Sequence, residues 1–142
     1  MHTALWPLQQ AIYAALTSYQ PLVDKVTGVY DAVPQTLIGS NGQVIKTAFP
    51  YVTLGEPTNT PFDTKLSFGE NIIFPVHCWS NYSGKKEAYE ILNLILGAMS
   101  KPLSLDGGFS IVDFQPQRPA VIQDIDGLSW HGIEEFRFYI NN

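Results

Sequence analysis

The sequence contains one cysteine, few charges and no excess of basic residues. Because Cys78 is alone, an intrachain disulfide is excluded, and with it a secreted disulfide framework. Eight basic residues against thirteen acidic ones give a net charge of −5. A protein that binds DNA regardless of sequence needs a basic stripe to neutralise phosphates. The acidic balance instead favours a surface that DNA passes without adhering.

Targeting and membrane signals are also missing. The first ten residues lack a basic start and a long apolar run, so no signal peptide is predicted. No stretch reaches the ~18 apolar residues of a membrane span. Charged residues make up 15% of the chain, below the usual ~25%, which predicts that something other than water covers much of the surface. We expect a soluble, intracellular protein without a membrane partner.

Catalytic patterns are absent or incomplete. His77 and Cys78 are neighbours on a predicted strand, so their side chains point to opposite faces. The same reasoning separates Glu134 from Glu135 and argues against a paired general acid and base. A pair between Cys78 and His131 stays open as a remote enzyme alternative, because their strands could lie side by side. Otherwise the sequence predicts that the protein is not an enzyme.

No metal or cofactor site is predicted. The three histidines have no metal-ligand spacing. Asp124-x-Asp126-Gly127 lacks the later ligands of a calcium loop, so a turn explains it better. Ser83-Gly84-Lys85-Lys86 precedes a predicted helix, but it lacks the upstream glycine and the following serine or threonine of a phosphate loop.

Apolar side chains are plentiful enough for a core. They make up 45% of the 142 residues, which favours a single domain over residues 1–142. The strongest pattern runs from Asn71 to Ser100 and predicts a buried strand over 71–79, a polar turn capped by Ser83, and an amphipathic helix. The apolar side of that helix consists of Ala88, Tyr89, Ile91, Leu92, Ile95, Leu96, Ala98 and Met99.

The remaining elements follow from hydrophobic periodicity. Residues 4–19 predict a first helix with Thr3 as its N-cap, followed by one more turn at 22–26. Pro75 predicts a bulge or an edge position for its strand. Strands are predicted over residues 29–33, 49–56, 71–79 and 128–140, and a hairpin around 106–108. The order predicts an α+β fold, with two helices on one face of a mainly antiparallel sheet.

Three segments are predicted to project from this fold. Residues 36–46 hold Ser-Asn-Gly between two β-prone runs and predict a hairpin. Residues 57–66 predict a long exposed loop, and residues 115–127 predict a second loop or an arm with a short strand. Both faces of strand 71–79 are largely apolar, which favours assembly with copies of the same chain.

These segments supply the candidate interface residues. Gly97 joins them because a glycine on the polar side of a helix could allow close approach by a neighbour, although a merely tolerated helix glycine explains it equally well. The candidates are Thr36, Ile38, Asn41, Val44, Lys46, Asn59, Phe62, Asp63, Gly97, Gln117, Arg118, Asp124 and Asp126.

Four segments, in order along the chain, resemble a known family. They are AIYAALTSYQPLVDKVTGVYDAVP (11–34), FPYVTLGE (49–56), VHCWSNYSGKKEAYEI (76–91) and WHGIEEFRFYI (130–140). Each is similar to a segment of the tail-completion, or tail-terminator, family of long-tailed phages and prophages. The resemblance covers nearly the whole chain, with residues 36–46 longer than the family's usual link.

The resemblance implies a structural virion protein of α+β fold. It implies a hexameric ring that caps the tail tube, ends tail elongation and joins the tail to the head, with the state in solution left open, a monomer included. The implied partners are copies of itself, the tail-tube protein and the head connector or head-completion protein, while DNA passes without specific binding. It implies no catalytic residues and no cofactor.

Some alternatives remain within this reading. A tail-tube or head-closure protein of the same particle is the nearest rival to a tail terminator. We expect loops 57–66 and 115–127 to become ordered on contact with partners. The implied location is the head–tail junction of the virion, after assembly in the host cytoplasm.

Overall fold

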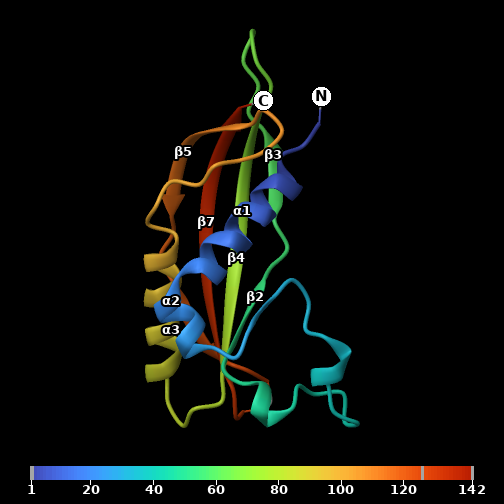
Figure 1. Ribbon diagram of the computed structural model, residues 1–142, viewed down its shortest axis with the longest axis vertical. Helices are drawn as coiled ribbons and strands as arrows, with labels where there is room; N and C mark the ends of the chain where they lie inside the picture. Colours follow the sequence, from blue (N-terminus) through green and yellow to red (C-terminus); the bar gives the residue numbers. More distant parts are fainter. Residues whose placement is uncertain (1, 126, 142) are drawn as a thin grey trace.

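The computed structural model describes residues 2–125 and 127–141, which form three α-helices and a seven-stranded sheet (Figure 1). The helices are α1 (Leu5–Ser18), α2 (Gln20–Lys25) and α3 (Lys86–Ala98). The strands are β1 (Val29–Tyr30), β2 (Tyr51–Leu54), β3 (Thr58–Pro61), β4 (Gly69–Ser80), β5 (Ser110–Pro116), β6 (Ala120–Gln123) and β7 (Trp130–Asn141). Two short 3-10 helices, η1 (Gln35–Leu37) and η2 (Lys46–Ala48), lie between β1 and β2.

Strands β4 and β7 form the centre of the sheet. They pair antiparallel along their full 12-residue lengths. The other edge of β4 is shared by β2 and β3, and the outer edge of β7 by β5 and β6. Strand β1 pairs parallel with β2. The predicted α+β class, with helices on one face of a mainly antiparallel sheet, is confirmed.

The core lies between the sheet and the helices. Every second residue of β4 is fully buried on the helix-covered face, and each large apolar side chain there contributes ~1.5–3 kcal/mol to stability. The predicted apolar faces of both long helices are confirmed, except that Tyr89 is exposed. The main core residues are Leu8, Ile12, Leu16, Leu22, Ile72, Phe74, Val76, Ile91, Leu92, Ile95, Phe136, Phe138 and Ile140.

The start of α1 differs from the prediction. Its N-cap position is Ala4, not Thr3, and the Ala4 backbone N–H donates to the Glu70 carboxylate of β4 at 2.8 Å. The side chain of Asn59 in β3 donates to the same carboxylate at 2.9 Å. Burial would raise the pKa of Glu70, but the hydrogen bonds from Thr3, Ala4 and Asn59 outweigh it and leave that pKa lowered. A distant carboxylate therefore anchors the helix.

The start of α3 also differs. Ser83 does not cap it, because the N-cap position is Lys85 and no side chain completes the cap. Instead Glu87, in the first turn, accepts a hydrogen bond from Ser80 Oγ at 2.7 Å. Lys25 of α2 lies 3.4 Å from the Glu87 carboxylate. The negative charge of Glu87 in the first turn disfavours binding of a phosphate next to Ser83-Gly84-Lys85-Lys86.

Pro75 lies in the middle of the sheet, not at a bulge or an edge. It pairs with Glu135 of β7 in unbroken register. On its other side β2 ends at Leu54 and β3 begins at Thr58, and the Pro75 carbonyl accepts from the Gly55 N–H at 2.8 Å. The missing N–H of proline thus falls where β4 changes partner, so no ladder hydrogen bond is lost.

The predicted hairpin around 106–108 is also wrong. Gly107 and Gly108 form a turn with positive φ, but residues 103–105 form no strand, and β5 pairs with β7 instead. In the part of the chain described, none of the helices combines the length and apolar character needed to cross a bilayer.

Candidate interaction surfaces

One face of the sheet carries the helices and the other is uncovered. On β4 the uncovered face presents Ile73, Pro75, His77 and Trp79, which are half-buried by neighbouring side chains. Ile133 of β7 pairs opposite His77 and extends the same surface. Both faces of β4 are largely apolar, as the sequence predicts, and one of them meets the helices. Such an uncovered face favours contact with another protein surface.

Two histidines and a tryptophan form the centre of the uncovered face. His77 Nδ1 and His131 Nε2 lie 2.7 Å apart, and the His131 ring stacks on Trp79 with ring centres 3.8 Å apart. Burial, together with the neighbouring His77, lowers the pKa of His131 to about 4. Burial also lowers the pKa of His77, against an opposing effect of Glu135. Both rings are therefore neutral at pH 7, which makes the patch easier to desolvate.

The Cys78–His131 pair is excluded by this arrangement. Cys78 is fully buried on the helix-covered face, where its thiol lies 3.8 Å from the Ala88 carbonyl. His131 pairs opposite Trp79 on the other face. Burial raises the pKa of the Cys78 thiol to about 12, so no thiolate forms near neutral pH. Among the described residues, no group of three His, Cys, Asp or Glu side chains could hold a metal ion.

Glu134 and Glu135 point to opposite faces, as predicted. Glu135 is exposed, whereas Glu134 is fully buried on the helix-covered side of β7. Neither carboxylate oxygen of Glu134 has a hydrogen-bond partner within the described part of the chain. Burial, and to a lesser extent the Glu135 charge, raises the pKa of Glu134 to about 7. The sequence around Glu134 did not predict that its carboxylate would be buried without a hydrogen-bond partner among the described residues.

The segment predicted as loop 57–66 is the first arm of a β-hairpin. Strand β3 pairs with the start of β4, and the tip projects beyond the sheet at the end that holds both termini (Figure 1). It brings together three candidates, since Asn59 lies on β3, Phe62 packs 5.1 Å from the Tyr139 ring, and Asp63 accepts from the Gly69 N–H at 3.1 Å. The segment is a paired strand and a hydrogen-bonded turn within the single chain, and ordering of loops 57–66 and 115–127 on contact with partners stays a prediction.

The predicted hairpin at 36–46 is present but minimal. Ile38 and Val44 form a single antiparallel bridge, and the exposed Asn41 closes the turn by accepting a backbone hydrogen bond at 3.0 Å. Thr36 and Lys46 lie in the flanking η1 and η2. The segment lies at the opposite end of the sheet from the β3–β4 tip (cyan to green, Figure 1).

The segment 115–127 is the predicted arm with a short strand, β6. The Gln117 backbone N–H donates to the Glu135 carbonyl at 2.9 Å, which holds the arm against β7, and Arg118 is exposed beside it. The Asp124 charge acts on His131, so this candidate lies near the histidine patch. Asp126 lies outside the described residues.

Gly97 has a neighbour within its own chain. A Cβ at this position would lie 2.8 Å from the hydroxyl oxygen of Tyr19, which connects α1 to α2. Close packing between helices explains the glycine, so its place as an intersubunit contact gains no support from this geometry.

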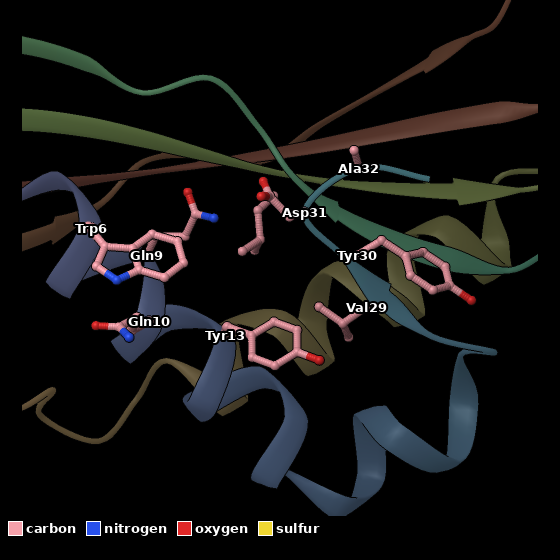
Figure 2. Close-up of a pocket in the computed structure, with 9 residues that line it drawn as sticks. Trp6, Gln9, Gln10, Tyr13, Val29, Tyr30, Asp31 and Ala32 are labelled. Atoms are coloured by element: carbon pink, nitrogen blue, oxygen red, sulfur yellow. The ribbon is translucent and has the colours of Figure 1, made fainter. Parts of the chain in front are cut away.

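An open groove of about 370 Å³ runs beside α1, and periodicity did not predict it. Trp6, Gln9 and Tyr13 project from α1 toward the segment that follows β1, where Asp31 faces them (Figure 2). Trp6 is 62% exposed. The sequence signal that could have indicated this groove is the pair of aromatic residues Trp6 and Tyr13. They are seven positions apart and lie on the side of the helix away from Leu8.

Comparison with known proteins agrees with the resemblance seen in the sequence. The family model described as tail completion protein gp17 matches residues 10–141. The tail completion protein gp17 of Bacillus phage SPP1 is 38% identical over 136 residues, covering 95% of this chain and 92% of the relative.

Two solved structures also match. The structure of bacteriophage SPP1 gp17 superposes with a TM-score of 0.59 at 36% identity, covering 92% of this chain and 86% of that one. A chain in the virion of a native gene transfer agent particle superposes with a TM-score of 0.82 over 100% of both chains, and at 21% identity it shows the shared fold alone. From the family model and the SPP1 relative together, this chain belongs to the tail completion protein gp17 family.

Proposed function

We propose that this protein caps the phage tail tube as a ring, ends tail elongation and provides the interface that joins tail to head. The observation that carries the proposal is the 38% identity to a phage tail completion protein across 95% of this chain. The solved structure of bacteriophage SPP1 gp17, 36% identical with 92% of this chain covered, supports the same role. The role is structural and not enzymatic, and the chain acts as one domain, because its buried apolar residues form one cluster.

The uncovered sheet face supports assembly into a homo-hexameric ring. Trp79 pairs opposite His131, and His77 pairs opposite Ile133, and both histidines are neutral at pH 7. Burying this part of the face against a second protein removes apolar area from water, while Glu135 and Arg137, opposite Pro75 and Ile73, need polar partners across the contact. The chain can remain monomeric in solution until a tail end presents the other partners, since association must first offset the lost rotational and translational freedom.

The other proposed partners are the tail-tube protein and the head connector or head-completion protein. The two ends of the sheet differ, since the 36–46 hairpin lies at the end opposite both termini (Figure 1), so one end can face the tube and the other the head. The net charge of −5 disfavours adhesion of DNA that passes through the ring. The protein would act at the head–tail junction, after assembly in the host cytoplasm.

The test is to make particles without this chain and examine them by negative-stain electron microscopy. The expected result is separate heads and tails, with tails overlong or unable to join, and recovery when the wild-type gene is supplied. An Ile133→Asp variant should fold but fail to restore joining, whereas Glu56→Gln, at an exposed position, should restore it. Intact infectious particles without the chain would rule out the proposal.

A further inference from the structure

The tip of the β3–β4 hairpin is a hydrogen-bonded projection that exposes apolar side chains. Its neck is closed by the Phe62 N–H donating to the Gly69 carbonyl at 2.8 Å, and its turn by Thr64 Oγ1, which accepts from the Ser67 N–H at 3.1 Å. Leu66 at the end is 98% exposed, and Phe68 is 54% exposed. A preordered tip of this kind loses little conformational entropy when it docks.

The groove beside α1 has the complementary shape and chemistry. Trp6 and Tyr13 offer apolar walls, while Gln9 and Gln10 offer amides that can pair with the backbone of an incoming turn (Figure 2). Its volume of about 370 Å³ lies at the lower end of the range for small-molecule pockets, ~300–1,000 Å³. The groove is open to one side, as docking of a hairpin tip requires.

Opposite charges on the hairpin tip and on the α1 groove indicate which segment occupies the groove. Lys65 stands next to Leu66 at the tip, and Asp31 lines the groove. Both are exposed, and neither belongs to an ion pair within residues 2–125 and 127–141. Lys65 stands beside the apolar Leu66, and Asp31 lines the groove with Trp6 and Tyr13, so the tip and the groove carry opposite charges next to apolar side chains.

We propose that the β3–β4 hairpin tip of one copy of this chain docks in the α1 groove of the next copy. Leu66 and Phe68 fill the apolar part of the groove, and Lys65 pairs with Asp31. The inference rests on the proposed function in one respect, that copies of the chain assemble with each other. It adds which two surfaces meet.

The contact is heterologous, because the tip and the groove are different surfaces. Each copy therefore has one free tip and one free groove, and repetition of the contact gives a closed ring or an open chain. The uncovered sheet face is not consumed by this contact, so it remains available to the tube or head partner or to a second contact within the ring.

A photo-crosslinking amino acid at position 66 tests the contact in assembled particles. After irradiation, mass spectrometry should find the tip joined to a peptide that contains Trp6 to Tyr13, or residues 29–32. Particles grown with a mixture of isotopically light and heavy chain should give mixed-isotope products, which places the two peptides on different copies. A product with another virion protein, with a second tip, or within one chain would overturn the proposal.

A charge swap gives the matched control. Lys65→Glu and Asp31→Lys alone should each lower the crosslink yield about fivefold, and the double variant should restore it. Lys101→Glu, at an exposed lysine away from both surfaces, should leave the yield unchanged. Failure of the double variant to recover while each single variant folds would refute the pairing.

The outcomes also separate the two proposals. Normal particle assembly without the chain removes the proposed function, whatever residue 66 contacts. Failed assembly without the chain, combined with normal assembly of particles that carry Leu66→Asp, keeps the function and removes the docking.

Discussion

Glu134→Gln should stabilise the protein at neutral pH and not at acid pH. Glu134 is fully buried on the helix-covered face of β7, and neither of its carboxylate oxygens has a partner within the described residues. An ionised carboxylate there is desolvated without compensation. Glutamine keeps the shape of the protonated acid and carries no charge, so the substitution isolates the electrostatic contribution.

The magnitude follows from the pKa. Burial, then the nearby Glu135 carboxylate, raises the pKa of Glu134 from 4.5 to about 7. The folded state thus holds this proton more tightly than the unfolded chain, so its stability is greatest below pH 4.5 and falls as pH rises to about 7. At ~1.4 kcal/mol for each pH unit between the two values, the wild type loses roughly 3 kcal/mol that the variant keeps.

Urea unfolding at intervals from pH 4 to pH 8 measures this difference. The free energy of unfolding of the variant minus that of the wild type should be constant below pH 4.5, rise through the window, and level off above pH 7. Subtraction removes the contributions of groups common to both proteins. Glu56→Gln, at an exposed carboxylate, should give a flat difference. A flat difference for Glu134→Gln would refute the reasoning, because it would mean that the carboxylate finds a partner or water.

Three further substitutions test other contacts. Glu70→Ala should destabilise the protein by about 1–2 kcal/mol at pH 7, less at pH 3, because a lowered pKa gives stability that is lost as pH falls; urea unfolding at both pH values measures it. Gly132→Ala should lower the free energy of unfolding by about 1–3 kcal/mol, since its Cβ would lie 2.5 Å from Cys78 Sγ. Cys78→Ala should restore part of that loss in a double-mutant cycle. Cys78→Ala should leave tail joining unaltered. His131→Phe should keep the stacking on Trp79 and resist acid better than the wild type, because the lowered His131 pKa of about 4 removes stability as pH falls from 6.5; thermal unfolding at pH 4 and pH 7 checks this.

Much of the fold was predictable because it depends on local spacing. The alternation in 128–140 predicted the buried face of β7, and the 3.6-residue period predicted the core sides of α1 and α3. In 71–79 both faces are largely apolar, so the sequence predicted a buried strand without indicating which face the helices cover. Short strands were harder. Thr58–Pro61 has no apolar alternation and four exposed residues, and it becomes β3 only because the edge of β4 is available there.

The candidate interface residues were predictable in kind but not in arrangement. Composition placed Asn59, Phe62 and Asp63 in an exposed segment, and they are exposed. It could not reveal that they form the neck of a hairpin, because that depends on pairing with residues 69–73. The packing of Gly97 was not predictable either, since the nearby Tyr19 lies between α1 and α2, far from Gly97 in the sequence.

The sequence by itself determined most of the core faces of α1, α3 and β7, that the fold is α+β, and which family the chain resembles. Those properties depend on residue type and on spacing within one element. Only the tertiary structure decided that Glu70 would anchor α1 from 66 positions away, that His77 would meet His131 across two strands, and that Cys78 would lie on the other face. Such contacts depend on strand register, and a shift of one residue would move every one of these side chains to the opposite face.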